Sequence, residues 1–305
     1  MAVFRDSRNF SNSVAAALDD DPATIVQDHS IGDIIRQAKN LSAEEVEKIL
    51  TYQRDKGMRF GEAAVALGFA SNDDVLNALS KQYHYPFTTD SDRKINKELV
   101  TGNQPFSRQA ESFRMIRSQL LNKLFKDTEN KRALAVVSPD EGDGKSYFAA
   151  NLAITFSQLG GRTLLVDANL RSPRQHELFS VDNTTGLSAI LSGRATKNVI
   201  RAVSAFPSLF VLPAGNVPPN PLELVERPAF GLLMRELINK FDHVIVDTAA
   251  ASHGADAVAV ASRSGAALVL ARKGSSRLQA IEAMVQDLQD TSAKVVGSVF
   301  NEVEA

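Results

Sequence analysis

A glycine-rich segment carries the residues whose types and spacing are best suited to chemistry. Gly142 and Gly144 precede Lys145 and Ser146, and an apolar run over residues 132–137 comes before them. Glycines let backbone N–H groups turn inward around phosphate oxygens, and the N-terminus of a helix favours anions. The lysine would contact the β- and γ-phosphates, and the serine hydroxyl would bind Mg²⁺. The segment therefore predicts binding of a nucleoside triphosphate, ATP, together with Mg²⁺.

The neighbouring loop positions extend this predicted site. Glu141, Asp143 and Tyr147 flank the glycines and the lysine, and we expect contacts to the nucleotide there as well. Because backbone N–H groups do the binding, the acidic side chains are expected to point to solvent. A strict phosphate-loop motif has glycine where Pro139 stands. An ordinary strand, turn and helix with a solvated lysine is therefore the alternative.

Two further apolar runs end in a carboxylate. Asp167 closes the run 163–167, and Asp247 closes the run 243–247. A carboxylate at the end of a buried strand needs a cation or hydrogen-bond donors, and Mg²⁺ on a nucleotide would provide the cation. We expect Asp247 to hold Mg²⁺, and Asp167 to face the metal or to accept a proton from the attacking hydroxyl. Helix capping is the structural alternative for each of them.

A fold must bring these residues together, and the order of apolar and helical patterns from residue 107 onward predicts which fold it is. An amphipathic helical pattern over residues 107–125 is followed by apolar runs that alternate with helical patterns. This alternation predicts an α/β fold with a doubly wound, mostly parallel sheet, whose ligand sites lie at the carboxyl ends of the strands. The predicted strands cover residues 132–137, 163–167, 209–213, 243–247, 266–271 and 294–300.

An internal repeat precedes this part of the chain. Residues 30–53 and 59–82 align without gaps, with Gly at the third position, Ser at the thirteenth and Gln at the last. Each unit predicts a short helix, a turn and a longer capped helix, so the pair would form a small all-α domain. The predicted organisation is a flexible arm (1–29), the helical domain (30–87), a linker (88–106) and the nucleotide-binding domain (107–305).

The amino-acid composition excludes several classes of function and of site. The 305 residues are 44% hydrophobic and 23% charged, with a net charge of −2 and no cysteine. A balanced charge argues against nucleic acid as a partner, and the lack of cysteine excludes disulfides, zinc–thiolate sites and a thiol nucleophile. No run approaches the ~20 apolar residues that span a bilayer. We therefore expect a cytoplasmic protein that reaches the inner membrane only through a partner.

Beyond these patterns, the chain resembles the bacterial P-loop tyrosine kinases of capsule and exopolysaccharide export. Their second phosphate-site signature is similar to residues 167–171 (DANLR), and their proline-rich hallmark is similar to residues 212–224. A helix before the first strand in that family carries Glu-x-x-Arg-x-x-Arg for ring assembly, and Glu111, Arg114 and Arg117 have this spacing. Ion pairs along one helix face are the alternative for these three residues.

The resemblance implies an ATP-dependent protein tyrosine kinase that regulates exopolysaccharide polymerisation, chain length and export. It implies Lys145, Asp167 and Asp247 as catalytic residues, and Asn169 and Arg171 as further nucleotide contacts. Residues 138–146 and 173–179 are similar to the corresponding segments of the EpsG-type kinase-like proteins associated with chain-length determinants. Expected partners are a separate membrane chain-length-determinant subunit, further copies in a homo-oligomeric ring, and a protein that carries the acceptor tyrosine.

Two departures from the family pattern leave catalysis open. Asn169 stands where the family usually has Asp, and asparagine can neither ionise nor accept a proton as a base. A non-catalytic or weakly catalytic ATP switch is therefore the main alternative. A partition-type ATPase is the second, although such proteins usually have a lysine where Asp140 stands. The chain also lacks the family's C-terminal tyrosine cluster, and its tyrosines are Tyr52, Tyr83, Tyr85 and Tyr147.

The repeat resembles the N-terminal domain of type II secretion and pilus-assembly ATPases, of which some members bind cyclic di-GMP. The second unit keeps the residues of that motif, which are Arg59, Gly61, Gly68 and Gln82. The first unit has Ser30 in place of the arginine, and so lacks a guanidinium that could stack on guanine or bind phosphate. A protein-docking module without a small ligand is the alternative.

Overall fold

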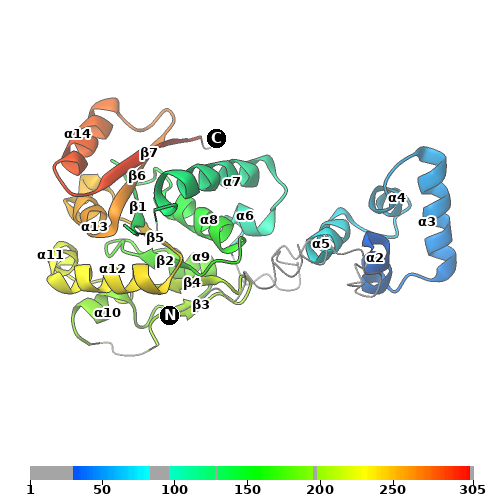
Figure 1. The fold of residues 1–305 in the computed structure, drawn as a ribbon, viewed down its shortest axis with the longest axis horizontal. Helices are drawn as coiled ribbons and strands as arrows, with labels where there is room; N and C mark the ends of the chain where they lie inside the picture. Colours follow the sequence, from blue (N-terminus) through cyan, green and yellow to red (C-terminus); the bar gives the residue numbers. More distant parts are fainter. Residues whose placement is uncertain (1–29, 83–95, 128, 195–197, 303–305) are drawn as a thin grey trace. The chain divides into compact units, whose positions relative to one another are not determined.

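The chain divides into two compact units, Met1–Tyr85 and Pro86–Ala305. A computed structural model describes residues 30–82, 96–127, 129–194 and 198–302 (Figure 1). The predicted arm over residues 1–29 lies outside the described residues. Each unit is described by itself.

Four helices form the described part of the N-terminal unit. They are α2 (Ile31–Lys39), α3 (Ala43–Lys56), α4 (Phe60–Ala66) and α5 (Asn72–Gln82). The second helix of each repeat begins with the same cap, because Ser42 Oγ accepts a hydrogen bond from Glu45 N and Ser71 Oγ accepts one from Asp74 N. The helical region predicted before the nucleotide-binding domain is confirmed.

The repeat-equivalent glycines Gly32 and Gly61 have different surroundings. A Cβ at Gly61 would lie 2.7 Å from Val75 Cγ1 of α5, whereas a Cβ at Gly32 would have only ordinary contacts, the nearest at 3.6 Å. Gly61→Ala should therefore lower the free energy of unfolding of this unit by about 1–3 kcal/mol. Gly32→Ala, the matched control, should leave it unchanged or raise it by up to about 1 kcal/mol, because alanine favours the helix. Hydrogen exchange of α4 and α5 in the whole chain would measure both, and equal effects would contradict this account.

The C-terminal unit is built on a seven-stranded sheet with the order β3-β4-β2-β5-β1-β6-β7. Its strands are β1 (Ala133–Val137), β2 (Thr163–Asp167), β3 (Arg201–Ala202), β4 (Leu209–Leu212), β5 (His243–Asp247), β6 (Gly265–Arg272) and β7 (Lys294–Asn301). All neighbouring pairs are parallel except β3 and β4. The six predicted strands are present within two residues of their predicted ends. Strand β3 was not predicted, because its two residues are too few to show an apolar run.

Helices cover both faces of this sheet (Figure 1). Alternate residues of β1 point to opposite faces, since Leu134 and Val136 pack in the core with α8, whereas Ala135 packs in the core with α12 and α13. The doubly wound α/β fold is therefore confirmed. The helices are α6 (Val100–Asn103), α7 (Arg108–Leu120) with a π-helical turn η2 (Leu121–Phe125), α8 (Lys145–Ser157), α9 (Gln175–Phe179), α10 (Leu187–Leu191), α11 (Pro221–Glu226), α12 (Pro228–Lys240), the 3₁₀ turn η3 (Ala251–His253), α13 (Asp256–Ser264) and α14 (Leu278–Gln289).

The predicted linker needs a correction over residues 96–106. Leu99 is buried in the core beside α8, and Thr101 Oγ1 donates to the side-chain oxygen of Asn151 at 3.0 Å. Asn151 Nδ2 in turn donates to the backbone oxygen of Glu98 at 3.1 Å. The polar composition of this segment suggested a connector, but its few apolar residues and buried amide contacts bind it to the C-terminal unit. Residues 88–95 lie outside the described residues.

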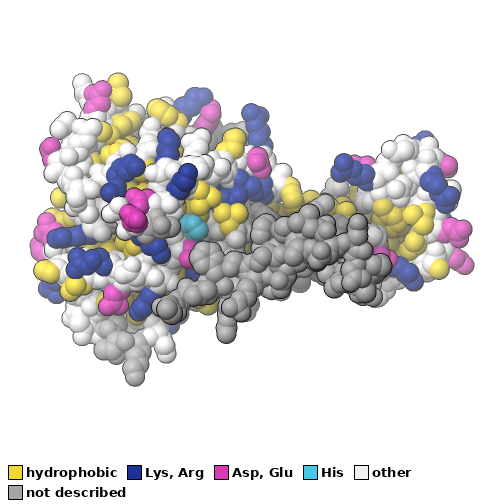
Figure 2. Space-filling view, viewed as in Figure 1, with side chains coloured by type: hydrophobic (Ala, Val, Ile, Leu, Met, Phe, Trp, Pro, Cys, Tyr) yellow, Lys and Arg dark blue, Asp and Glu magenta, His cyan; other side chains and the backbone are white. Residues whose placement is uncertain are grey.

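The described residues include no membrane-spanning helix, and the face in Figure 2 carries side chains of both charges. No helix among the described residues is long and apolar enough to cross a membrane. Figure 2 shows Lys and Arg side chains interspersed with Asp and Glu side chains on the face in view. This distribution agrees with the small net charge of −2.

Candidate active site

The glycine-rich loop joins the carboxyl end of β1 to the start of α8. Gly142 and Gly144 have φ angles of 80° and 95°, in the left-handed region that favours glycine. A Cβ at Gly144 would also lie 2.4 Å from Asn301 Nδ2, which donates to the backbone oxygen of Asp143 at 2.9 Å. Both backbone conformation and close packing therefore require glycine at position 144.

The side chain of Lys145 forms hydrogen bonds with residues of the same loop. Its side chain is 6% exposed, and Nζ donates to Ser138 Oγ at 2.8 Å and to the backbone oxygen of Asp140 at 3.0 Å. Burial lowers the pKa of Lys145, and the nearby charge of Asp247 opposes this shift. A buried ammonium whose present partners are a hydroxyl and a carbonyl is well placed to bind phosphate oxygens instead.

The expectation that the acidic loop residues face solvent is wrong for Asp143. This side chain is fully buried, and its Oδ2 accepts a hydrogen bond from Asp140 N at 2.9 Å while Oδ1 accepts one from Ser276 Oγ at 2.8 Å. Asp143 therefore stabilises the loop from inside, and its predicted nucleotide contact stays a prediction. Glu141 is exposed as expected, with an oxygen 3.5 Å from Nε2 of His253.

Asp247 lies where the loop and the sheet meet. The parallel register pairs it with Val136 of β1 on one side and with Asp167 of β2 on the other. Its side chain is 0% exposed, and Oδ2 accepts a hydrogen bond from Gln175 Nε2 at 2.8 Å. Burial raises the pKa of Asp247, whereas Ser146, Gln175 and Lys145 oppose this rise.

One oxygen of Asp247 remains available to a metal ion. Oδ1 is buried and accepts no hydrogen bond from the described residues. A buried carboxylate oxygen without a donor is costly, and a divalent cation would remove that cost. A hydrogen-bond contact with the hydroxyl of Ser146, a predicted metal ligand, is among the causes that lower the pKa of Asp247, so the two groups lie side by side and the residues present fit Mg²⁺.

Asp167, in contrast, has partners for both oxygens. Oδ1 accepts a hydrogen bond from Asn169 N at 3.2 Å, and Oδ2 accepts from the backbone N–H groups of Arg174 and Gln175 at 3.1 and 3.0 Å. Burial and the nearby Asp247 raise the pKa of Asp167 well above its usual range. These contacts resemble the capping alternative, and a catalytic or metal role for Asp167 stays a prediction.

Asn169 and Arg171 are both engaged in contacts within the protein. The Asn169 amide closes a turn with Ser172, donating from Nδ2 to the backbone oxygen at 2.9 Å and accepting from the backbone N–H at 3.1 Å. Arg171 Nη2 forms an ion pair with Asp256 Oδ2 at 2.9 Å. A carboxylate at position 169 could accept the second of the turn contacts but could not make the first.

Tyr147 follows the loop but makes packing contacts rather than facing it. Its hydroxyl accepts a hydrogen bond from Gln109 Nε2 of α7 at 2.9 Å, and its ring centre lies 6.1 Å from that of Phe113. Burial raises the pKa of the Tyr147 phenol. Its predicted nucleotide contact therefore stays a prediction, with packing as its observed role.

The predicted assembly residues share the helix α7. Arg114 Nη1 forms an ion pair with Glu111 Oε2 at 2.6 Å, as the helix-pair alternative expects. Arg117 turns toward α8 instead, where Nη1 donates to the backbone oxygen of Thr155 at 2.6 Å. Glu111 is exposed, so the assembly role of this face stays a prediction.

In the N-terminal unit, the described members of the predicted dinucleotide motif have structural roles. Arg59 precedes α4 and its N–H donates to Glu62, Gly61 packs against α5, and Gly68 adopts a left-handed turn with φ of 75°. The side chain of Gln82 lies outside the described residues. No described observation gathers these residues into a ligand site, so the cyclic di-GMP prediction finds no support here.

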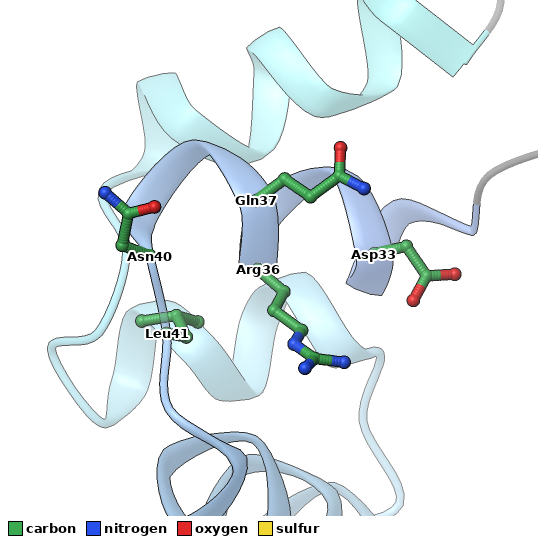
Figure 3. Close-up of a pocket in the computed structure, with 5 residues that line it drawn as sticks. All are labelled: Asp33, Arg36, Gln37, Asn40 and Leu41. Atoms are coloured by element: carbon green, nitrogen blue, oxygen red, sulfur yellow. The ribbon is translucent and has the colours of Figure 1, made fainter.

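A hollow of about 550 Å³ lies on the other repeat instead. It is lined by Asp33, Arg36, Gln37, Asn40 and Leu41. The first four side chains come from α2 and its C-cap, and Leu41 follows them (Figure 3). A wall contributed almost entirely by one helix does not enclose a ligand.

Several residues that no sequence motif indicates are brought to the site by the fold. Ser138 accepts from Lys145, while Ser276, which follows β6, and Asn301, at the end of β7, form hydrogen bonds that stabilise the loop. Gln175 donates to both Asp247 and the backbone of Ser146. A neutral side chain gives no motif by itself, so only the three-dimensional structure reveals these contacts.

Comparison with known proteins agrees with this geometry. The family described as "CobQ/CobB/MinD/ParA nucleotide binding domain" matches residues 134–305. The tyrosine-protein kinase CpsD of Streptococcus agalactiae is 33% identical over 194 residues, which cover 63% of this chain and 83% of CpsD. CapB of Staphylococcus aureus is 36% identical over 151 residues, which cover 49% of this chain and 65% of CapB.

A solved structure of a tyrosine kinase domain also resembles this chain. The kinase domain of the Escherichia coli tyrosine kinase ETK matches with a TM-score of 0.65 and 30% identity, covering 71% of this chain and 84% of that chain. The predicted fold and the predicted resemblance to tyrosine kinases are therefore confirmed, and the C-terminal unit is a nucleotide-binding domain. The chain belongs to the family of bacterial tyrosine-protein kinases within the CobQ/CobB/MinD/ParA nucleotide-binding proteins.

Proposed function

We propose that this chain transfers the γ-phosphoryl group of ATP to a tyrosine hydroxyl of a protein. The observation that carries the proposal is the buried Oδ1 of Asp247, which accepts no hydrogen bond from the part of the chain that the structure describes, next to the glycine-rich loop with its buried Lys145. A loop that binds phosphates beside a carboxylate that fits a divalent cation is the arrangement that phosphoryl transfer requires.

Each residue has a distinct task in this reaction. Backbone N–H groups of the loop around Gly142 and Gly144 bind phosphate oxygens, and Lys145 exchanges Ser138 and Asp140 for the phosphates. Ser146 and Asp247 would hold Mg²⁺, which neutralises phosphate charge when bound.

The tyrosine proton also needs an acceptor. Asp167 is our candidate, because it is a carboxylate at the end of β2 whose register pairs it with Asp247. The backbone N–H groups of Arg174 and Gln175 hold the Asp167 carboxyl in place for this step. Arg171 and Asn169 would shape the adjoining turn.

The wider role follows from the resemblance and is part of the proposal. We propose a cytoplasmic protein that works beside a membrane chain-length-determinant subunit in exopolysaccharide assembly, and that forms a homo-oligomer through Glu111, Arg114 and Arg117. Since CpsD and ETK are tyrosine kinases, a kinase is favoured over a partition-type ATPase. The small N-terminal unit would serve as a protein-docking module.

A specific observation keeps the ATP-binding switch as a second candidate. Asn169 carries no charge and its amide is bound to Ser172, so it adds nothing to metal binding in this arrangement. We expect the native chain to be active all the same, because Asp247 supplies the oxygen that a metal needs.

Asn169→Asp tests this expectation. The substitution should change the rate of tyrosine phosphorylation by less than about tenfold, since residue 169 closes a turn rather than facing Asp247 Oδ1. The measurement is phosphotyrosine formed from Mg-ATP on a tyrosine-containing polypeptide. A silent native chain together with an active Asn169→Asp variant would instead establish the switch.

A further inference from the structure

Gln175 occupies a central position that no sequence motif signals. It is the first residue of α9 and is 0% exposed. Its Nε2 donates to Asp247 Oδ2 at 2.8 Å and to the backbone oxygen of Ser146 at 3.1 Å. Its backbone N–H donates to Asp167 Oδ2 at 3.0 Å. One buried residue thus joins the phosphate loop to the two strands that end in carboxylates.

These contacts fix how Asp247 presents its carboxylate. Because Oδ2 is bound to the Gln175 amide, Oδ1 is left as the oxygen without a donor. The second bond, to Ser146, ties this orientation to the first turn of α8, where the predicted serine ligand lies. A carboxylate that is free to rotate would lose this fixed relation to the serine hydroxyl.

These contacts leave one polar atom of Gln175 without a partner among the described residues, which is unfavourable for folding. Oε1 of Gln175 is buried and accepts no hydrogen bond from the described residues. Such an oxygen is unfavourable in the folded protein, whereas an apolar side chain of similar shape would avoid this cost. Asn169 makes no comparable contact to Asp247, because its amide is bound to Ser172.

We propose that Gln175 is a positioning residue that orients Asp247 for the divalent cation and couples the cation site to the phosphate loop. This inference rests on the proposed function, since it deepens the account of the same site. Outer partners of metal ligands commonly change metal affinity or activity by about 10–100-fold when they are replaced. We expect Gln175 to belong to this class.

The test separates metal-dependent from metal-independent binding of ADP. Gln175→Met has nearly the same volume and cannot donate, and Gln175→Asn is too short to reach both Ser146 O and Asp247 Oδ2. For each variant of the full chain, the affinity for fluorescent ADP is measured with Mg²⁺ and with EDTA, and Mn²⁺ affinity is measured by electron paramagnetic resonance. The control is Gln286→Met, since Gln286 makes an exposed amide-to-carboxylate contact with Asp290 on α14.

We expect both Gln175 variants to bind metal-free ADP within about threefold of the native chain, and to lose about tenfold or more of the Mg²⁺-dependent gain and of Mn²⁺ affinity. The control should match the native chain. A folded Gln175 variant with a native Mg²⁺-dependent gain would overturn the inference, and so would equal losses with and without metal. Failure of the native chain to bind ADP under any condition would contradict the proposed function itself.

Discussion

Replacing Lys145 by methionine is expected to lower the rate of phosphoryl transfer from ATP by about a thousandfold, equivalent to about 4 kcal/mol of transition-state stabilisation. The ammonium is desolvated, so its attraction to phosphate oxygens is stronger than that of a surface lysine. Methionine fills a similar volume, so the fold should survive although Ser138 and Asp140 lose a donor. The measurement is the initial rate of phosphotyrosine formation with radiolabelled ATP.

The matched control is Lys240→Met. Lys240 is an exposed lysine of α12, 3.5 Å from Glu236 across one helical turn, and is not part of the site. Its replacement should leave the rate unchanged, because exposed pairs of this kind contribute little. A Lys145→Met variant that is folded and retains more than about a tenth of the native rate would show that the lysine does not stabilise the transferring phosphoryl group.

Replacing Asp247 by asparagine should have opposite effects on activity and on stability. Removing the carboxylate removes a metal ligand, so phosphoryl transfer should fall by about a thousandfold. The free energy of unfolding should nevertheless rise by about 1–2 kcal/mol, because a neutral amide costs less to bury than the charge of the fully buried carboxylate. The raised pKa of Asp247 has the same sign, since burial disfavours its charged form.

Both effects of Asp247→Asn can be measured on the same preparation. Thermal unfolding without nucleotide should shift upward, whereas the added stabilisation that Mg-ADP gives the native chain should be lost. Asp242→Asn is the matched control, because Asp242 is an exposed residue just before the other end of the same strand. If Asp247→Asn unfolds at a lower temperature than the native chain, burial of the Asp247 charge is not a source of instability.

The sequence predicts the fold of the C-terminal unit well because its strands are buried on both faces. Runs such as Leu164 to Val166 are apolar at every position, and the structure buries every residue of β2. The helix over residues 107–125 was equally clear, although its last turn is π-helical. The segment around Leu99 was assigned to a linker because one buried leucine among polar residues gives no periodic pattern.

The candidate site was predictable only where local sequence determines geometry. The glycines of the loop and the strand-end carboxylates have local signatures, and the structure brings Lys145 and Asp247 together as expected. Asp143 was misjudged, because its hydroxyl partner Ser276 is remote in sequence. The contacts of Gln175 likewise depend on how α9 meets β5, which a neutral residue in a short helix does not indicate.

The most direct test of the central claim is single-turnover transfer of the labelled γ-phosphate of ATP by the purified native chain, with phosphotyrosine identified by mass spectrometry. We predict that label appears on tyrosine in the presence of Mg²⁺, that EDTA abolishes it, and that the Lys145→Met chain forms none above background. Binding of Mg-ATP by the native chain without any phosphotyrosine, on itself or on added tyrosine polypeptide, would contradict the account.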